Sequence, residues 1–309
     1  MFCSTVLSSD TGGYVPWTLM NQGGWSHSWY LTKGRRPNQE DTMDIVHHNG
    51  THIFGVFDGH NGWMCSRRLQ ENFCKELMGK VAPLNLANRQ QVEQVLRQEI
   101  LRFEATFKEE AGQKNRPDGS TLNLCVIKGK NLVCANVGDS RSVLVRKGQA
   151  SKLSEDHKPT NPAEAKRVEA AGGFIERNTD KAWRVNGIIS VSRSLGDFNL
   201  KARKPGLICE PEFKHHNITE GDEYLVIGTD GLWDGLSIED VAYTTTQKAG
   251  PGCAKALVQA SLSRGSTDNT AVIVVDLRGA FTDGPPPQGP GAASQAVSGF
   301  VRMLGECFG

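Results

Sequence analysis

Four apolar runs in this sequence each lead to an aspartate, and this repetition constrains the fold more than any other feature. The first run, residues 53–57, ends at Asp58 and is followed by Gly59 and His60. Similar runs at 133–138, 188–191 and 224–229 lead to Asp139, Asp197 and Asp230. Apolar runs of this length are typical of buried strands. The fold therefore has several buried strands that each end near a carboxylate.

Carboxylates gathered at the ends of buried strands repel one another unless a cation lies among them. Mg²⁺ and Mn²⁺ are hard cations that take oxygen ligands of this kind. We therefore expect a metal site whose ligands come from the whole chain. The alternative, a calcium-binding module, would need its ligands close together in one loop, such as D-x-[DN]-x-[DN]-G.

Each acidic segment also has an ordinary structural explanation. The Asp58-Gly59 and Asp230-Gly231 pairs are typical of turns. Asp139 could pair with Arg141 on the surface, and Asp234 could cap the helix that follows it. A loop would explain Asp268-Asn269. The repetition of an acid beside an apolar run is what favours one shared site.

The chain is long enough for a substantial core, and its charge is nearly balanced. It has 309 residues, with 35 Lys plus Arg against 34 Asp plus Glu, for a net charge of +1. This balance gives no electrostatic reason to expect nucleic acid or a membrane surface as a partner. No stretch approaches the roughly 18 apolar residues of a membrane span, and no cysteine pair has zinc-ligand spacing. We expect a soluble cytosolic or nuclear monomer with reduced thiols.

Helix and strand patterns alternate in blocks. Apolar residues at helical spacing predict helices over 61–78 and 92–107, and capping residues predict helix starts at Asn161, Ser237 and Pro251. Two hairpins are predicted, 121–127 with 132–137 and 142–146 with 150–153. A last strand follows over 269–277.

Hairpins favour antiparallel sheets over a doubly wound parallel sheet. We therefore predict an α+β fold, in which two antiparallel β-sheets form a central sandwich flanked by pairs of helices, giving four layers in the order α-β-β-α. The histidines outside the motifs are expected on the surface, namely His47, His48, His215 and His216.

The patterned region has boundaries on both sides. Residues 1–22 are predicted to be an N-terminal extension and 23–278 the folded domain. Pro and Gly crowd residues 284–291, which is typical of an extended linker. The apolar residues between 297 and 308 have the spacing of a short amphipathic helix. We therefore predict that residues 279–309 are a linker and tail.

Seven short motifs occur in order along the patterned region: GRRPNQED, FGVFDGHNG, GST, ANVGDSR, VSRSLGDF, GTDGLWD and STDN. Together they resemble the successive motifs of the metal-dependent serine/threonine protein phosphatases of type 2C. The resemblance covers about residues 25–277. It includes HKPTNPAEAKRVEAAGG, which leads into the region where the family has its flap, about 155–187. The resemblance implies a type 2C phosphatase domain and phosphoprotein substrates.

The resemblance implies metal-binding roles for seven residues. Asp58 would bridge two divalent ions, Mg²⁺ or Mn²⁺. Glu40 and the Gly59 carbonyl would complete the shell of one ion, and Asp230 and Asp268 would hold the other. Asp139, with Asp230 and Asp234, would bind a weaker third ion.

The resemblance also implies how the reaction proceeds: a hydroxide bound to the dinuclear centre attacks the phosphorus of phosphoserine or phosphothreonine. Arg36 would bind the substrate phosphate, since a guanidinium can contact it with two parallel hydrogen bonds. His60 would act as the general acid, because histidine titrates in a suitable range. Residues in a supporting role would be Asp41, Thr121, Asp197 and Asn269.

One residue departs from the family pattern. Asn61 follows His60 where the family usually has Ala or Gly, and we expect the turn to survive because Asn tolerates left-handed backbone geometry. The alternative function is a catalytically inactive relative that serves as a binding scaffold. Such a protein would be expected to lack carboxylates, whereas the full set is present here: Glu40, Asp58, Asp139, Asp230 and Asp268.

Overall fold

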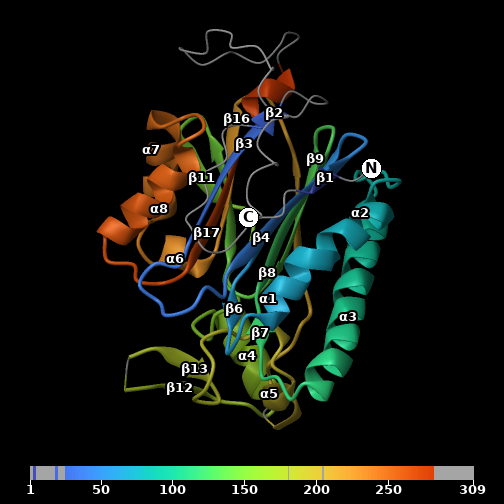
Figure 1. Ribbon diagram of the computed structural model, residues 1–309, viewed down its shortest axis with the longest axis vertical. Coiled ribbons are helices and arrows are strands. Elements are labelled where there is room, and N and C mark those ends of the chain that lie inside the picture. Colours follow the sequence, from blue (N-terminus) through green and yellow to red (C-terminus); the bar gives the residue numbers. More distant parts are fainter. Residues whose placement is uncertain (1–2, 5–17, 20–24, 180, 204, 282–309) are drawn as a thin grey trace, which may run out of the picture.

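The computed structural model of this protein describes residues 3–4, 18–19, 25–179, 181–203 and 205–281. The predicted linker at 284–291 and the predicted tail helix lie outside these residues, as does most of the predicted N-terminal extension. The described elements form four layers, with two sheets in the middle and helices on both outer sides (Figure 1).

Two antiparallel sheets of six strands each form the centre. The first has the order β1-β4-β5-β8-β9-β15, with strands Cys3–Ser4, Thr42–His48, Thr51–Phe57, Leu122–Lys128, Asn131–Val137 and Glu212–Asn217. The second has the order β11-β10-β16-β17-β3-β2, with strands Gln149–Lys152, Arg141–Arg146, Asp222–Gly228, Thr270–Asp276, Ser26–Thr32 and Thr18–Leu19. The two predicted hairpins are confirmed as β8 with β9 and β10 with β11.

An apolar core fills the space between the two sheets. It includes Trp29 and Ile273 from the second sheet and Met43 and Phe54 from the first. The neighbour of Phe54 in β5, Ile53, faces the other way and packs under the helices. Because both faces of each sheet are covered, the strands have continuous apolar runs instead of polar-apolar alternation. The predicted sandwich of antiparallel sheets is confirmed.

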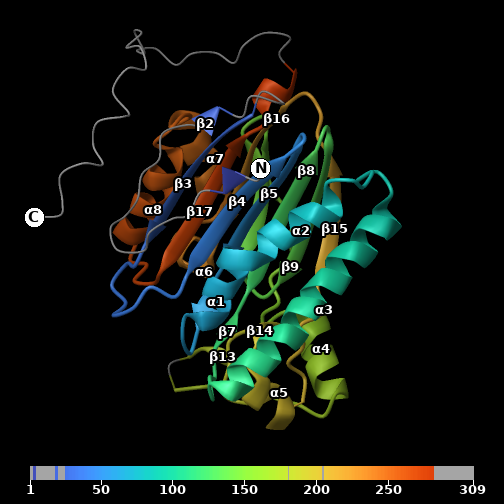
Figure 2. The same cartoon turned by 45° about the vertical axis from the view of Figure 1, so that its right-hand side comes forward.

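Two helical segments cover the outer face of the first sheet (Figure 2). The first consists of α1 (Met64–Arg68), a π-helical turn (Leu69–Phe73) and α2 (Cys74–Val81), and the second is α3 (Arg89–Gln113). Both predicted helices are present, and their apolar stripes are buried against the sheet. The sequence pattern did not predict the π-helical turn or the start at Met64.

Three helices cover the outer face of the second sheet: α6 (Asp230–Trp233), α7 (Ile238–Gln247) and α8 (Cys253–Ser263). The predicted cap of α7 is confirmed, because Ser237 Oγ accepts from the Asp240 N–H and Asp240 Oδ2 accepts from the Ser237 N–H. The predicted helix start at Pro251 is wrong by two residues, since a turn with Gly250 precedes Cys253. No helix in the described part of the chain is long and apolar enough to cross a bilayer.

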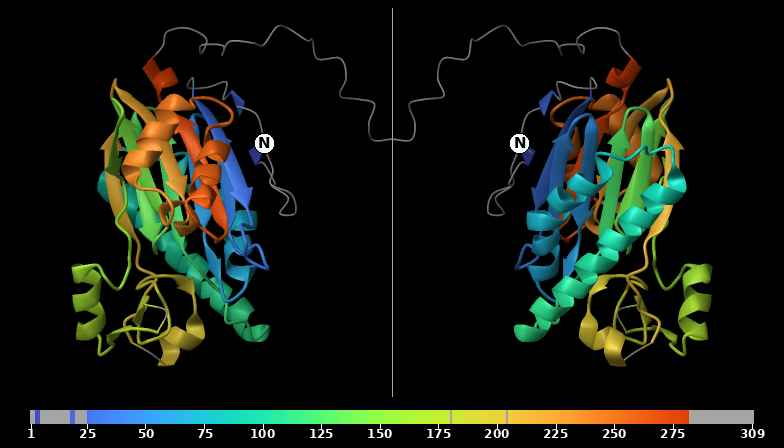
Figure 3. Two further views of the ribbon diagram at one scale, coloured as in Figure 1. Left: turned by 90° about the vertical axis from the view of Figure 1, so that its left-hand side faces the viewer. Right: turned by 90° about the vertical axis from the view of Figure 1, so that its right-hand side faces the viewer.

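The segment between β11 and β15 forms a separate lobe at one end of the sandwich (Figure 3). It contains α4 (Pro162–Ala170), the hairpin β12–β13 (Ile175–Arg177 and Trp183–Val185) and α5 (Phe198–Arg203). A small sheet, β14-β7-β6, joins it to the domain, with strands Leu195–Gly196, Gly119–Ser120 and Gly59–His60. The predicted start of α4 is confirmed by the Asn161 side chain, whose Oδ1 accepts from the Ala163 N–H.

Two expectations in this region and in β15 are wrong. Residues 188–191 do not form a buried strand, because the chain turns at Gly187 and leaves Ile188 44% exposed. His215 and His216 are not free surface residues, since each ring Nε2 lies 2.8 Å from a carboxylate oxygen, of Glu93 and Asp222 respectively. His47 and His48 are likewise half-buried.

Candidate active site

Three carboxylates meet at the end of the sandwich nearest the lobe. Asp58 follows β5, Asp139 follows β9, and Asp230 begins α6 just after β16. One oxygen of each lies within 4.8 Å of the other two. Negative charges this close are unfavourable without a cation, and carboxylate oxygens are ligands of hard divalent ions. The donor set of this triad therefore fits a divalent metal site.

The electrostatic environment of the triad also supports a cation site. Burial raises the pKa of Asp58 well above its ordinary value, and the charges of Asp41 and Asp139 raise it further. Burial also raises the pKa of Asp230, followed by the charges of Asp58 and Asp139. These carboxylates are thus held together at an energetic cost that a bound cation would offset.

The triad lines a cavity of about 410 Å³. The cavity wall contains all the predicted site residues except Asp197 and Asp234, that is Arg36, Glu40, Asp41, Asp58, Gly59, His60, Thr121, Asp139, Asp230, Asp268 and Asn269. The opposite wall comes from the lobe and includes Arg184 and residues 188–191. One cavity therefore brings together residues that are up to 233 positions apart, from Arg36 to Asn269.

Close backbone packing places Gly59 against Glu40. A Cβ at Gly59 would collide with the Glu40 carbonyl oxygen and with Ser66 Oγ, which itself donates to that carbonyl at 2.5 Å. Only glycine therefore fits at position 59. Gly59 lies in the short strand β6, so the alternative explanation of Asp58-Gly59 as a simple turn is wrong.

Three of the predicted supporting residues hold the backbone around the triad. Thr121 Oγ1 accepts from the Asp58 N–H at 3.1 Å. Asn269 accepts from the Glu40 N–H at 2.7 Å and donates to two backbone carbonyls of residues 33 and 38. Asp41 Oδ2 accepts from Thr229 Oγ1 at 2.7 Å, just before Asp230. Each of these contacts orders a segment that carries a cavity carboxylate.

The fourth supporting residue, Asp197, lies behind His60. His60 Nε2 is 2.6 Å from Asp197 Oδ2, which also accepts from Ser194 Oγ at 2.7 Å. Burial alone would lower the pKa of His60, but Asp197 outweighs it and the net pKa is raised. A Cβ at Gly119 would collide with both side chains of this pair. A glycine is therefore required where the imidazole and the carboxylate meet.

Asp197 and Asn61 both have left-handed backbone geometry, with φ of +51° and +56°. The expectation that Asn61 can adopt this conformation is confirmed. Such geometry costs energy in non-glycine residues, and strained conformations of this kind cluster at functional sites.

Asp234 is the least connected of the predicted ligands. It ends α6, where its N–H donates to the Asp230 carbonyl at 2.8 Å, and its side chain does not line the cavity. It does not cap α7, whose cap is Ser237. The suggested capping role of Asp234 is therefore wrong.

The motifs did not assign a role to Lys158, a charged residue beside the triad. Lys158 Nζ lies 3.3 Å from Asp139 Oδ2. Burial alone would lower the pKa of Lys158, but Asp139 and Asp230 raise it, and the net pKa is above its ordinary value. The signal available in the sequence was the charged HKP sequence, residues 157–159, near the start of the lobe.

The sequence matches the model of the family described as Protein phosphatase 2C over residues 18–270. Probable protein phosphatase 2C 76 of Arabidopsis thaliana is 35% identical over 89% of this chain and 65% of the relative. Probable protein phosphatase 2C 56 of Oryza sativa subsp. japonica is 34% identical over 87% of this chain and 76% of the relative. The chain thus spans slightly less than two thirds of the first relative's length.

A solved structure has the same fold. The crystal structure of serine-threonine phosphatase 2C from Toxoplasma gondii matches with a TM-score of 0.75 and 21% identity, over 86% of this chain and 99% of that one. The family match covers most of the described domain, and the relatives are more than 30% identical. This chain therefore belongs to the protein phosphatase 2C family.

Proposed function

We propose that this chain is a metal-dependent protein phosphatase that hydrolyses phosphoserine and phosphothreonine in protein substrates. The observation that carries the proposal is the triad of Asp58, Asp139 and Asp230 in one cavity with Arg36. The names of the relatives, all protein phosphatases of type 2C, support the same reaction.

The metal ligands would come from both sheets. Asp58, Glu40 and the Gly59 carbonyl would hold one ion, and Asp58, Asp230 and Asp268 would hold a second. Asp139 and Asp230 would hold a third, weaker ion, which Asp234 would have to reach from outside the cavity wall. Bound Mg²⁺ or Mn²⁺ would supply an acidified water as nucleophile and positive charge for the phosphoryl oxygens.

Arg36 would orient the substrate phosphate. Its side chain is 58% exposed at the cavity and its Nη2 lies 2.6 Å from Asp268 Oδ2. The guanidinium has five N–H donors, so this contact leaves further donors for phosphate oxygens. Because the group stays charged at every accessible pH, it also offsets negative charge that develops at phosphorus.

His60 would protonate the leaving serine or threonine oxygen. In this role the His60 Nε2–H would donate a hydrogen bond to Asp197 Oδ2, 2.6 Å away, which would leave the Nδ1–H to protonate the leaving group. The Asp197 carboxylate would also stabilise the protonated ring of His60, so that His60 keeps its proton until the leaving alkoxide forms. Asp197 would thus be a positioning residue, while His60 touches the reacting atoms.

The test is phosphatase activity of the purified chain on p-nitrophenyl phosphate and on a phosphothreonine peptide, with Mn²⁺ or Mg²⁺ and with chelator. Both substrates should be hydrolysed with metal, and chelator should abolish turnover. Asp58→Asn should remove activity and at least one bound ion while the fold is kept. Asp276→Asn is the matched control, because Asp276 is a strand-end carboxylate of β17 that pairs with Arg278 outside the cavity.

A metal-loaded, folded protein that turns over neither substrate would refute the proposal and favour a binding scaffold. Full activity of the Asp58→Asn variant would instead contradict the proposal that Asp58 is a ligand shared by two metal ions.

A further inference from the structure

Lys158 lies beside one carboxylate of the triad. Its Nζ is 3.3 Å from Asp139 Oδ2, and Asp139 is only 4% exposed. Because lysine is protonated at neutral pH, its ammonium already places a positive charge beside a carboxylate that is proposed to bind a metal ion. Arg36 has a similar contact with Asp268 at another part of the cavity wall.

The backbone that carries Lys158 is fastened to the backbone that carries Asp139. The His157 N–H donates to the Gly138 carbonyl at 3.0 Å, and the Gly138 N–H donates to His157 Nδ1 at 3.1 Å. His157 is 1% exposed. Because these two residues directly precede Lys158 and Asp139, the paired hydrogen bonds keep the ammonium within reach of the carboxylate.

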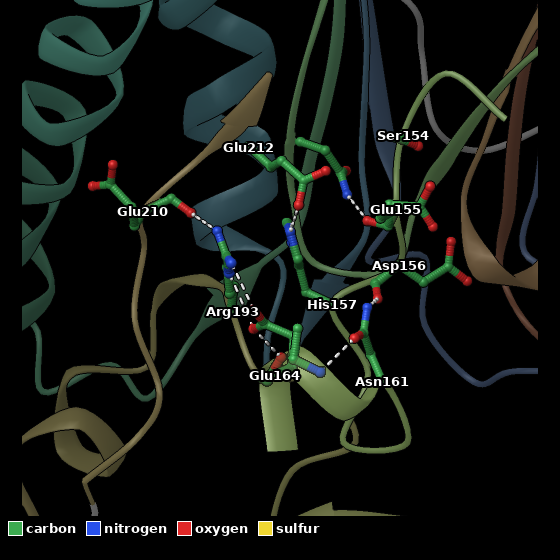
Figure 4. Close-up of polar contacts among 12 residues, drawn as sticks. Ser154, Glu155, Asp156, His157, Asn161, Glu164, Arg193, Glu210 and Glu212 are labelled. Carbon is green, nitrogen blue, oxygen red and sulfur yellow. Dashed lines mark hydrogen bonds and ion pairs between the residues drawn. The ribbon is translucent and has the colours of Figure 1, made fainter. Parts of the chain in front are cut away.

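A wider polar network holds the same segment in place (Figure 4). The His157 carbonyl accepts from the Ser192 N–H at 2.8 Å, and His157 Nε2 lies 3.4 Å from Glu212 Oε2. Beside it, Arg193 donates to Glu164 at 2.6 Å and to the Glu210 carbonyl at 2.9 Å. Lys158 can therefore leave Asp139 by rotating its flexible side chain, but not by moving its backbone.

We propose that Lys158 is a built-in cation that competes with divalent metal for Asp139 and thereby sets the affinity of the weakest metal site. This inference rests on the metal-dependent function proposed above. A divalent ion bound beside Asp139 faces a like charge on Lys158, and the two cations share one carboxylate. The ion must displace the ammonium or bind less tightly. This competition should reduce the affinity for metal ions held by Glu40 or Asp268 less.

The test measures Mn²⁺ binding directly, by electron paramagnetic resonance of free Mn²⁺ during titration of the chain. Lys158→Met removes the charge and keeps the length of the side chain, and it should tighten the weakest Mn²⁺ step by about tenfold or more, as expected for removal of a neighbouring like charge. Lys158→Arg keeps the charge and should leave that step weak. In an Asp139→Asn background, Lys158→Met should change Mn²⁺ affinity by less than about twofold, because the shared carboxylate is gone.

Lys214→Met is the matched control, since Lys214 Nζ pairs with Glu155 Oε1 at 2.7 Å outside the cavity wall and should not change any Mn²⁺ step. An unchanged weakest step in a folded Lys158→Met variant would overturn the inference. So would a raised KM with unchanged Mn²⁺ affinities, which would make Lys158 a substrate-binding residue. Absence of Mn²⁺ binding by the parent chain would instead refute the proposed function, and this inference with it.

Discussion

Arg36 Nη2 lies 2.6 Å from Asp268 Oδ2, and the two residues are 232 positions apart in the sequence. The residue proposed to bind phosphate thus shares a carboxylate with a proposed metal site. Asp268 also accepts from the Asn269 N–H through its other oxygen, Oδ1, at 2.8 Å, which fixes the carboxylate plane. The position of the guanidinium therefore depends on the same side chain as the proposed metal.

Arg36→Ala should raise KM for a phosphothreonine peptide by about tenfold or more, because it removes a charged donor of phosphate hydrogen bonds. Arg36→Lys should restore only part of the affinity, since an ammonium cannot reproduce the two parallel hydrogen bonds of a guanidinium. Steady-state kinetics with the phosphothreonine peptide would measure KM for both variants. Arg35→Ala is the control, as Arg35 is exposed and does not line the cavity. A normal KM for Arg36→Ala would contradict the phosphate role.

His60→Ala should slow hydrolysis of the phosphothreonine peptide by about 10²–10⁴-fold, the usual contribution of a general acid. Hydrolysis of p-nitrophenyl phosphate should fall much less, because its leaving group needs little protonation. Asp197→Asn should show the same preference in weaker form, since it keeps the imidazole and removes the charge that raises its pKa. Equal losses on both substrates would rule out proton donation by His60.

Glu164→Gln should lower the free energy of unfolding by about 3 kcal/mol, the cost of breaking a buried ion pair by removing one partner. Glu164 is 3% exposed and accepts from Arg193, Arg167 and Ser192. Burial alone would raise its pKa, but these donors lower it well below the ordinary value. Urea unfolding and limited proteolysis of the lobe measure the effect. Glu169→Gln on the exposed side of α4 should change stability by no more than about 0.5 kcal/mol.

The buried His27 should make the fold less stable in acid. Burial, followed by the charges of the neighbouring His47 and His52, lowers the pKa of His27 to about 4. The unfolded chain therefore binds this proton more readily, so stability is complete above about pH 6.5 and falls as the pH drops towards 4. The loss from this residue is about 3 kcal/mol. His27→Leu should flatten the decline, as measured by urea unfolding in chelator between pH 7 and 4.5. An equally steep decline in the variant would show that other groups cause it.

Local patterns in the sequence were sufficient to predict most of the framework. The strand before Asp58, the helix caps at Asn161 and Ser237, and the hairpin around Gly129 each depend on residues within a few positions. These features follow from side-chain periodicity and local hydrogen bonds, which short windows contain. The stretch 188–191 does not form the predicted strand, because a short apolar run does not by itself specify a strand.

The contacts that complete the site could not be predicted in this way. His60 meets Asp197 across 137 positions, and Lys158 meets Asp139 through a backbone pairing that no local pattern specifies. Asp234 has the right spacing from Asp230, yet it does not reach the cavity wall. The order of the motifs predicts that these residues share one site. Their individual contacts could not be predicted, because they depend on packing between the sheets, the helices and the lobe.

The hydrogen bond between the Ser192 N–H and the His157 carbonyl joins two residues of the lobe that are 35 positions apart in the sequence. The chain between them leaves and returns at almost one point, so the length of this segment does not set the spacing of the cavity carboxylates. Exchange of residues 175–185, which include the hairpin β12–β13, for a segment of another length leaves the Glu164–Arg193 ion pair in place and should be tolerated by the rest of the domain. This hairpin is therefore a place where a different target preference can be grafted without moving the cavity carboxylates.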